Sequence, residues 1–340
     1  MELWVILGPT AVGKSQVGVE VAGLLDGEIV VADSMQVYKG LDIGTAKLTE
    51  AEKVAGNGRY IPHHLVDIIT PDQPFSVAEY QQLARQAIAE ISGRGKVPLL
   101  VGGSPLYLRA VTDPGYSFPP LKPDPGLRQR LHQQAREQGP ESLHRELARV
   151  DPPTAARLHP NDWRRVVRAL EIYYLTGQPP SGWRPRQVED LPYSVRFTGL
   201  NLPRPELYRR INRRTEEMLG RGWVEEVKGL LAAGYSPELP SLQGLGYRQV
   251  VAFLQGVCSW EEMVRLIQRD TRRFAKRQLT WFRQDPRIRW FDVSRYPNAR
   301  ALAAEIVAAD SRTTSSDVEY TTPTGTKPPL EGKVGEQRSD

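Results

Sequence analysis

Near its N-terminus the chain carries a short segment with the residue types and spacing of a phosphate-binding loop. The segment consists of Gly8, Pro9, Thr10, Ala11, Val12, Gly13, Lys14 and Ser15. It matches G-x-x-x-x-G-K-[ST] in full, with an apolar run before it and a helical pattern after it. Glycines let the backbone wrap around an anion, and successive N–H groups at a helix N-terminus supply partial positive charge. We expect Lys14 to reach the terminal phosphate of a bound chain and the Ser15 hydroxyl to bind Mg²⁺.

A carboxylate follows the second apolar run of the chain, where a strand would end. Asp33 comes directly after residues 28–32 and opens a polar segment that continues through Ser34, Met35 and Gln36. Ligands of open α/β sheets bind at the carboxyl ends of the strands, so Asp33 should face the same site as the phosphate loop. From its position alone, Asp33 could bind a metal, act as a base toward a substrate, or only cap the next turn.

The third apolar run, residues 97–101, ends without a carboxylate. It is followed by Gly102, Gly103 and Ser104, whereas an NTPase usually places an Asp at the end of a later strand to hold Mg²⁺. The phosphate loop therefore indicates a ligand with a phosphate chain, but it does not indicate hydrolysis of a nucleoside triphosphate.

A row of basic residues recurs with helical spacing in the second half of the chain. It consists of Arg265, Arg269, Arg272, Lys276 and Arg283. On a helical wheel these side chains fall within one stripe, and the apolar Ile267, Phe274 and Trp281 fall on the opposite face. Because few acidic residues lie one turn away, we expect the stripe to be unneutralised and to bind a nucleic-acid backbone. The alternative is a charged face that contacts only solvent.

Two further groups of basic residues favour a polyanionic partner. The first lies at 164–168 and the second at 209–214, and both have helical patterns. Arginine holds phosphate with two parallel hydrogen bonds, so members of the second group could instead reach a bound diphosphate. The formal net charge of +5 and the isoelectric point near 9.2 are only a mild basic excess, so the distribution of the charge matters more than its sum.

Short apolar runs, typical of buried strands, alternate along the chain with segments of helical spacing. They predict the elements that would position these residues. The predicted strands are residues 3–7, 28–32, 97–101, 195–200 and 288–293. The predicted helices of the same part are residues 16–25, 77–91, 206–233 and, as two helices, 244–283. This alternation predicts an α/β fold with a parallel, P-loop NTPase-like sheet and flanking helices on both faces.

The pattern changes after about residue 112. Five prolines between Pro114 and Pro125 break regular structure, and polar amphipathic helices are predicted beyond them. We therefore expect a core formed by residues 1–112 and 196–309, with a largely helical insertion at 113–195. Residues 310–340 are rich in Ser, Thr, Gly, Pro and charge, which predicts a disordered tail.

The composition excludes several classes of protein. Of the 340 residues, 40% are apolar and 25% are charged, as is usual for a soluble protein. Cys258 is the only cysteine, so neither an intrachain disulfide nor a cysteine metal cluster can form. The N-terminus lacks the features of a signal peptide, and no apolar run reaches the roughly 18 residues of a membrane span. We expect a cytoplasmic protein that does not bind membranes, and nothing demands more than a monomer.

Seven segments, taken together, resemble one enzyme family in content and order. They are GPTAVGKS, ADSMQVYKGLDIGTAK, PHHLVDI, VGGSPLY, NDWRRVVRALE, LQGLGYRQV and AKRQLTWFR. Over residues 2 to 305, they resemble the tRNA dimethylallyltransferases, also called tRNA isopentenyltransferases. The end of the chain has no Cys-His pattern, so it lacks the zinc-finger extension of some eukaryotic relatives and fits the bacterial type better.

The resemblance implies a reaction. A dimethylallyl group would pass from dimethylallyl diphosphate to the exocyclic amine of the adenosine immediately 3′ of the anticodon, which is flipped out of its stack. Asp33 matches the carboxylate that holds and deprotonates this amine. The phosphate loop would bind the diphosphate with Mg²⁺, with Lys14 as a catalytic residue and Arg214 nearby. Ser104, the third catalytic residue, stands where the family usually has Thr, so the hydroxyl is preserved.

The resemblance also implies contacts with the anticodon stem-loop of tRNA, in part through the helical insertion. The matching positions are Asp33, Ser34, Met35, Gln36, Arg164, Arg165, Val166, Val167, Arg168, Gln243, Gly244, Leu245, Gly246, Tyr247, Arg248, Arg272, Lys276, Arg277, Gln278, Trp281 and Arg283.

Two other classes of function compete with this hypothesis. A P-loop kinase that binds ATP and phosphorylates a nucleoside or small metabolite would explain the phosphate loop and Asp33, but not the basic stripe. An RNA-binding module with a vestigial loop would explain the stripe. Turnover of ATP to ADP would favour the kinase, and tight tRNA binding without catalysis would favour the module.

Overall fold

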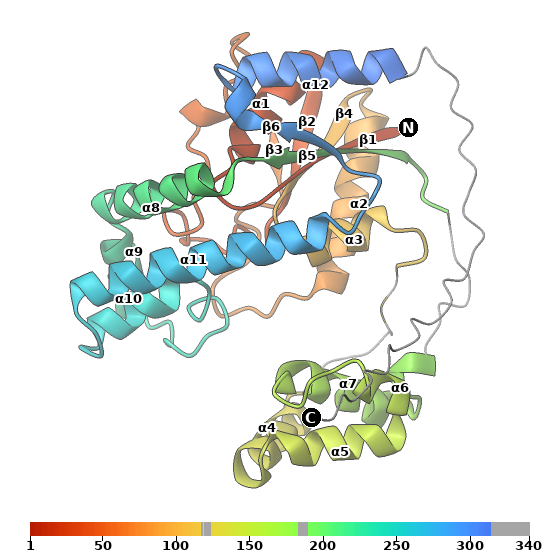
Figure 1. Cartoon of the computed structure of the whole chain (residues 1–340), viewed down its shortest axis with the longest axis vertical. Coiled ribbons are helices and arrows are strands. Elements are labelled where there is room, and N and C mark those ends of the chain that lie inside the picture. Colours follow the sequence, from red (N-terminus) through yellow and green to blue (C-terminus); the bar gives the residue numbers. More distant parts are fainter. Residues whose placement is uncertain (117, 119–123, 183–189, 314–340) are drawn as a thin grey trace, which may run out of the picture.

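A parallel β-sheet forms the centre of the protein. The computed structural model describes residues 1–116, 118, 124–182 and 190–313. The strands are β1 (Glu2–Leu7), β2 (Gly27–Ala32), β3 (His63–His64), β4 (Val97–Gly102), β5 (Ser194–Asn201) and β6 (Arg289–Asp292). They form one six-stranded sheet in the order β3-β2-β4-β1-β5-β6 (Figure 1). Each neighbouring pair is parallel, so the predicted α/β fold is confirmed.

Helices cover both faces of the sheet, which explains the continuous apolar runs of its strands. The covering helices are α1 (Lys14–Leu25) and α12 (Ala299–Thr313) on one face, and α2 (Val77–Gly93) and α3 (Pro105–Thr112) on the other. Within β1, Ile6 belongs to the core beneath α1 and α12, whereas Val5 and Leu7 belong to the core beneath α2 and α3. This division follows from the two-residue period of a strand.

Between α3 and β5 the chain leaves the core and forms a separate helical unit, at the bottom of Figure 1. Its helices are α4 (Pro125–Gln138), α5 (Pro140–Val150), α6 (Pro152–Ala155), α7 (Trp163–Thr176) and the short 3-10 helix η2 (Pro180–Gly182). Its own buried core includes Leu131, Leu143, Leu147, Val166 and Leu170. Because β5 starts at Ser194, which pairs with Glu2 of β1, residues 194 and 195 belong to the sheet rather than to the insertion.

Four helices between β5 and β6 complete the core. They are α8 (Arg204–Gly220), α9 (Trp223–Ala232), α10 (Tyr247–Leu254) and α11 (Trp260–Phe282). The single helix expected over 206–233 is broken at Gly222, whose φ of 96° is a left-handed conformation that favours glycine. These four helices share a third apolar core with the loop that follows β2.

The last described helix, α12, was not predicted. Asn298 Oδ1 accepts a hydrogen bond from the Ala301 N–H (2.9 Å) at its start, and Leu302 and Ile306 are buried in the core that contains α1. The prediction of a disordered tail from residue 310 is wrong for residues 310–313, which are helical. The rest of that prediction concerns residues 314–340, which lie outside the described residues.

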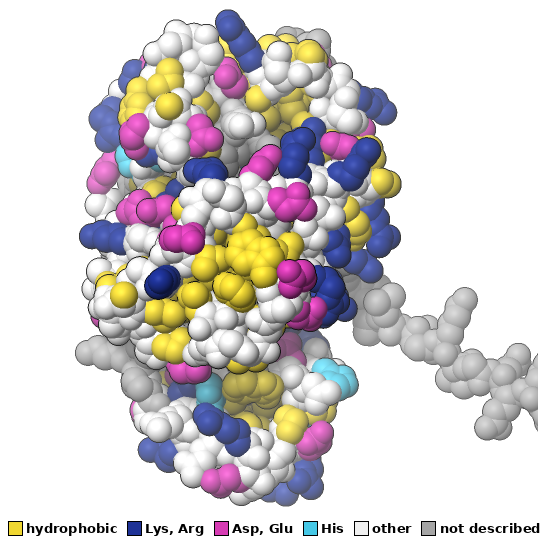
Figure 2. Space-filling view, turned by 90° about the vertical axis from the view of Figure 1, so that its left-hand side faces the viewer, with side chains coloured by type: hydrophobic (Ala, Val, Ile, Leu, Met, Phe, Trp, Pro, Cys, Tyr) yellow, Lys and Arg dark blue, Asp and Glu magenta, His cyan; other side chains and the backbone are white. Residues whose placement is uncertain are grey.

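The remaining described elements are two short 3-10 helices, η1 (Ala51–Lys53) and η3 (Val293–Arg295). Among the described residues, we find no helix with the length and apolar character that a membrane crossing requires. Figure 2 looks onto the side that carries α8 to α10, where hydrophobic side chains gather in one area. Val257, in the connection between α10 and α11, is 73% exposed, and Trp260, the first residue of α11, is 43% exposed.

Candidate active site

The predicted phosphate-binding loop joins β1 to α1 at the carboxyl ends of the strands. Gly8 passes so close to β5 that a Cβ atom on it would lie 2.6 Å from the Leu200 carbonyl oxygen. At the other end, Gly13 has a φ of 102° and precedes Lys14, the first residue of α1. The two glycines of the motif therefore permit a tight turn that other residues would disfavour.

Two cations approach this loop. Nζ of Lys14 donates a hydrogen bond to the Pro9 carbonyl oxygen (2.7 Å), and Nη1 of Arg214 on α8 donates to Thr10 Oγ1 (3.3 Å). Burial, and then the charge of Arg214, lower the pKa of Lys14 to about 7, although Asp33 acts in the opposite direction. Burial also lowers the pKa of Arg214. A multiply charged anion at the loop would stabilise both poorly solvated cations.

Asp33 and Ser104 lie together where β2 and β4 end. Asp33 Oδ1 accepts a hydrogen bond from the Met35 N–H (2.8 Å), and Ser104 Oγ accepts one from the Ser34 N–H (3.2 Å). Ser104 precedes α3 but makes no side-chain capping bond to it, so its hydroxyl proton can be donated to a ligand. The negative charge of Asp33 opposes the lowering of the pKa values of Lys14 and Arg214 by burial.

A hollow of about 250 Å³ opens beside the phosphate loop. The residues around it include Lys14, Ser15, Lys47, Arg214, Glu217 and Arg221. The described residues contain no group of three His, Cys, Asp or Glu side chains placed to hold a metal ion. Mg²⁺ commonly retains water and binds substrate phosphates through few protein ligands, so a single hydroxyl such as that of Ser15 fits this ion.

Gln278, which was expected to contact tRNA, points into the protein instead. Its side chain is buried, with the residue only 3% exposed. Oε1 accepts a hydrogen bond from the Thr10 N–H (2.9 Å), and Nε2 donates one to the Gly103 carbonyl oxygen (2.6 Å). The amide lies between the phosphate loop and the turn after β4 rather than on the surface, and its contact with tRNA stays a prediction. Four other predicted tRNA contacts are also buried, namely Val166, Val167, Gly246 and Tyr247.

The basic stripe on α11 is partly neutralised, contrary to the sequence-based expectation. Arg265 pairs with Glu262 (2.5 Å), and Arg269 pairs with Asp270 (2.8 Å). Asp270 also binds Arg248 of α10 (3.1 Å). The N-terminal half of the stripe therefore offers less free charge than the helical wheel predicts.

The C-terminal half of the stripe keeps its charge. Its members Lys276 and Arg283, and the adjacent Arg277, are exposed, and within the described part of the chain none of them has an ion pair. Arg272 is half-buried and donates a hydrogen bond to Asn212 Oδ1 on α8 (2.6 Å). The fully buried side chains of α11 are Met263, Ile267, Ala275, Gln278 and Phe282. Phe274 and Trp281, which were expected in the apolar seam, are only partly buried.

The other two basic groups are mostly paired with acidic residues in, or directly before, their own helices. On α7, Arg165 pairs with Asp162 (3.4 Å) and Arg168 pairs with the buried Glu171 (2.7 Å). Arg164 is exposed and lies over the Trp163 ring, 5.7 Å from its centroid. On α8, the pairs are Arg209 and Arg210 with Glu206, and Arg213 with Glu217.

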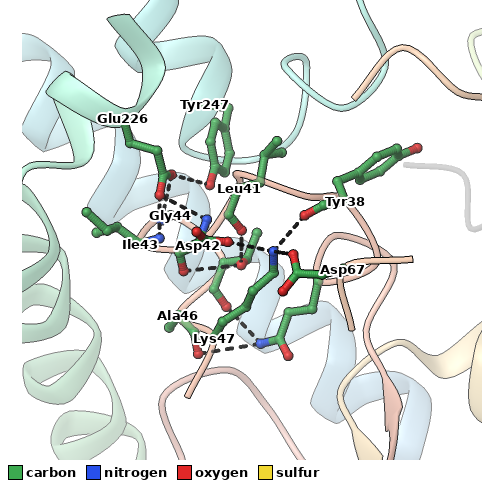
Figure 3. A network of polar contacts seen from close by, with 12 residues as sticks. Tyr38, Leu41, Asp42, Ile43, Gly44, Ala46, Lys47, Asp67, Glu226 and Tyr247 are labelled. Carbon is green, nitrogen blue, oxygen red and sulfur yellow. Dashed lines mark hydrogen bonds and ion pairs between the residues drawn. The ribbon is translucent and has the colours of Figure 1, made fainter. Parts of the chain in front are cut away.

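Sequence reasoning missed the carboxylate that holds the loop after β2 (Figure 3). Glu226 of α9 accepts hydrogen bonds from the N–H groups of Asp42 (2.9 Å) and Ile43 (2.6 Å), and from the Tyr247 hydroxyl (2.6 Å). From the other side, Lys47 Nζ binds Asp42 Oδ1 at 2.7 Å. Its bonds to the Tyr38 carbonyl oxygen and to Asp67 complete the network. A single Glu within an amphipathic helix gives no sequence signal for such a role.

Comparison with known proteins identifies the family. Residues 36–285 match the family model described as IPP transferase. The chain is 50% identical over 317 residues to the tRNA dimethylallyltransferase of Moorella thermoacetica, covering 92% of this chain and 96% of that relative. The chain belongs to the IPP transferase family. A second relative, the tRNA dimethylallyltransferase of Desulforudis audaxviator, is 51% identical over 307 residues, which are 90% of this chain and 97% of the relative.

Solved IPP transferase structures share the fold. The tRNA isopentenylpyrophosphate transferase of Bacillus halodurans aligns with a TM-score of 0.66 and 39% identity, over 92% of this chain and 98% of that chain. A eukaryotic dimethylallyltransferase acting on tRNA aligns with a TM-score of 0.74 and 29% identity, over 92% of this chain and 80% of that chain. The resemblance found in the sequence motifs is confirmed.

Proposed function

We propose that this protein transfers the dimethylallyl group of dimethylallyl diphosphate to the exocyclic amine of the adenosine immediately 3′ of the anticodon in tRNA. The observation that carries the proposal is the placement of a phosphate loop, with Lys14 and Arg214, beside Asp33 and Ser104 at neighbouring strand ends. Membership of the IPP transferase family, and the activities named for its relatives, support the choice of donor and acceptor.

In the proposed reaction, the amine nitrogen attacks the first carbon of the prenyl chain. The carbon–oxygen bond breaks, diphosphate leaves with the bonding electrons, and the nitrogen then loses one proton. In this scheme Asp33 would accept that proton, and the Ser104 hydroxyl would help to orient the adenine. Lys14, Arg214 and the loop N–H groups would stabilise the charge of the leaving diphosphate. Because an adenine amine is a poor nucleophile, orientation in the site should contribute more than the strength of the base.

Mg²⁺ fits this scheme as a partner of the diphosphate. It would add positive charge next to the leaving group. Ser15 would contribute its hydroxyl, and diphosphate oxygens and water would fill the other positions. The lack of a three-residue acidic or histidine cluster in the described part of the chain supports such a substrate-held ion.

We further propose that the anticodon arm binds across both units of the protein. Exposed cations lie on α11 (Lys276, Arg277 and Arg283) and on α7 (Arg164). On the face shown in Figure 2, a recess lies between the core and the helical unit. When the arm is bound there, the adenosine would flip out of its stack toward Asp33, since an enzyme that modifies a base takes it out of the stack. One chain carries all of these residues, so we propose that the protein acts as a monomer, in the cytoplasm.

The decisive experiment combines purified protein, unmodified tRNA, Mg²⁺ and dimethylallyl diphosphate labelled in its prenyl group. We expect label in the tRNA, and nuclease digestion should release it as N6-isopentenyladenosine. Asp33→Ala should retain tRNA binding but lose most of the turnover, because this side chain acts at the reaction step. Absence of label with a tRNA accepted by another family member would refute the proposed function. Conversion of ATP to ADP with a small acceptor would then favour the kinase.

A further inference from the structure

Gln278 joins the donor and acceptor halves of the candidate site through one side chain. Its Oε1 accepts a hydrogen bond from the Thr10 N–H (2.9 Å), within the phosphate loop that follows β1. Its Nε2 donates one to the Gly103 carbonyl oxygen (2.6 Å), immediately before Ser104 at the end of β4. Both ends of a single buried amide are therefore used, one for each half of the site.

The space around this amide is closely fitted. A Cβ atom on Gly103 would lie 2.6 Å from Gln278 Nε2, which is closer than real contacts allow. The same atom would be 3.3 Å from the Gly8 carbonyl oxygen and 3.4 Å from Lys14 Nζ. Glycine at position 103 thus lets the amide reach a point next to the catalytic lysine. At position 278, the carboxylate of glutamate could accept the hydrogen bond from the Thr10 N–H but could not donate one to the Gly103 carbonyl oxygen. An apolar side chain could make neither hydrogen bond.

Other bonds extend the link in both directions. Thr10 is also held by Arg214, whose Nη1 donates to the Thr10 hydroxyl (3.3 Å). On the acceptor side, Ser104 Oγ accepts the Ser34 N–H (3.2 Å) and so lies beside Asp33. The chain of contacts from the donor loop to the acceptor carboxylate therefore passes through Gln278. The helix that bears Gln278 also exposes Lys276, Arg277 and Arg283, three of the cations assigned above to tRNA.

We propose that Gln278 is a positioning residue for prenyl transfer. It fixes the phosphate loop relative to Ser104 and Asp33, so that the donor carbon is held in line with the acceptor amine. This inference rests on the proposed function. Catalysis that depends on orientation is sensitive to small displacements, since a shift of about 1 Å can cost on the order of 100-fold in rate. The effect should therefore appear in kcat rather than in the binding of either substrate.

The first test replaces Gln278 with methionine, which has similar length but cannot make the two hydrogen bonds. We expect kcat to fall by about 100-fold. The KM for dimethylallyl diphosphate and the dissociation constant for tRNA should each stay within about threefold of wild type. Gln268→Met is the matched control, because Gln268 lies on the same helix but donates to Glu216 Oε1 (3.2 Å) and does not contact the loop. This control should retain wild-type kcat.

A double-mutant cycle separates positioning from general damage. Gly103→Ala pushes its methyl group into the amide, whereas Gln278→Ala vacates that space. If the two residues act as one link, kcat of the double variant should match that of the worse single variant. Multiplication of the two losses would show independent damage and overturn the inference. So would wild-type kcat in Gln278→Met, or equal losses in kcat, tRNA affinity and melting temperature. All of these comparisons are made against a wild-type protein that transfers the labelled prenyl group. If the wild-type protein transfers no label, the proposed function fails; if it does and the variants behave otherwise than expected, only the role of Gln278 fails.

Discussion

At the scale of single residues, Lys14 is a cation whose charge depends on pH near neutrality. Its pKa is lowered to about 7 by burial and then by Arg214, against the opposing effect of Asp33. In the ligand-free protein, Lys14 is therefore protonated below about pH 7 and increasingly neutral above it. Binding of a diphosphate favours the protonated form, so binding should be accompanied by proton uptake at higher pH.

The consequence is a pH-dependent affinity for the donor. Without tRNA, the dissociation constant for dimethylallyl diphosphate should rise by up to about tenfold per pH unit between about pH 7 and about pH 9. Calorimetry at several pH values would measure the affinity and the proton uptake together. Lys14→Arg keeps its charge throughout this range, so its affinity should be nearly independent of pH. An equal rise in that variant would assign the titration to another group.

The residues that could be predicted are those whose role is local. The phosphate loop was predictable because a continuous segment provides its glycines, lysine and hydroxyl. Asp33 and Ser104 were predictable as residues that follow strands. Gln278 was predicted only as a tRNA contact, because it lies in a segment that resembles a tRNA-contacting stretch of the family. Its hydrogen bonds to the phosphate loop and to Gly103 were not predictable, because Thr10 and Gly103 lie far away in sequence. Only the folded chain shows which face of the helix meets the loop.

At the scale of elements, the loop after β2 is held by α9 through Glu226 (Figure 3). The carboxylate accepts bonds from three successive backbone N–H groups, at residues 42 to 44, and from the Tyr247 hydroxyl. A carboxylate suits this position because it only accepts hydrogen bonds. The same loop begins at Asp33, so the contact also helps to define where the acceptor side of the site lies.

Replacement of this carboxylate by an amide should destabilise the protein. Glu226→Gln directs an NH₂ group at backbone donors, and the lost charge-assisted bonds should cost about 1.5–3 kcal/mol in the free energy of unfolding. Urea unfolding would measure the change. Glu225→Gln is the control, because Glu225 is exposed in the first turn of the same helix and should cost only a few tenths of a kcal/mol. Equal losses in the two variants would contradict the assigned role.

Helical wheels explain both the success and the failure in predicting α11. The wheel placed the cations on one stripe and Ile267 on the buried side. It could not show that Asn212 of α8 binds Arg272, or that Asp270 is shared by Arg248 and Arg269, because two of these contacts come from other helices. For α12, the sequence did contain a signal, since an asparagine precedes apolar residues at helical spacing.

At the scale of the whole molecule, the chain divides its exposed cations between two units with separate cores. Lys276 lies on α11 of the core, and Arg164 lies on α7 of the helical unit. The helical unit packs around its own apolar residues, so it does not need the core to bury them. An inserted unit of this kind is suited to enlarge the surface for a long, rigid polyanion such as a tRNA arm.

If one tRNA contacts both units, the salt dependence of binding should report both. Each phosphate contact contributes roughly 0.7 to 0.9 to the slope of log affinity against log salt concentration. Lys276→Ala and Arg164→Ala should each reduce the magnitude of the slope by the contribution of about one phosphate contact, and the double variant by that of about two. Arg265→Ala is the control, because Arg265 is paired with Glu262 and should leave the slope nearly unchanged. Filter binding over a range of salt concentrations would measure it. A slope that changes only for Lys276→Ala would restrict the tRNA to the core, because a tRNA held by both units must release counterions from both.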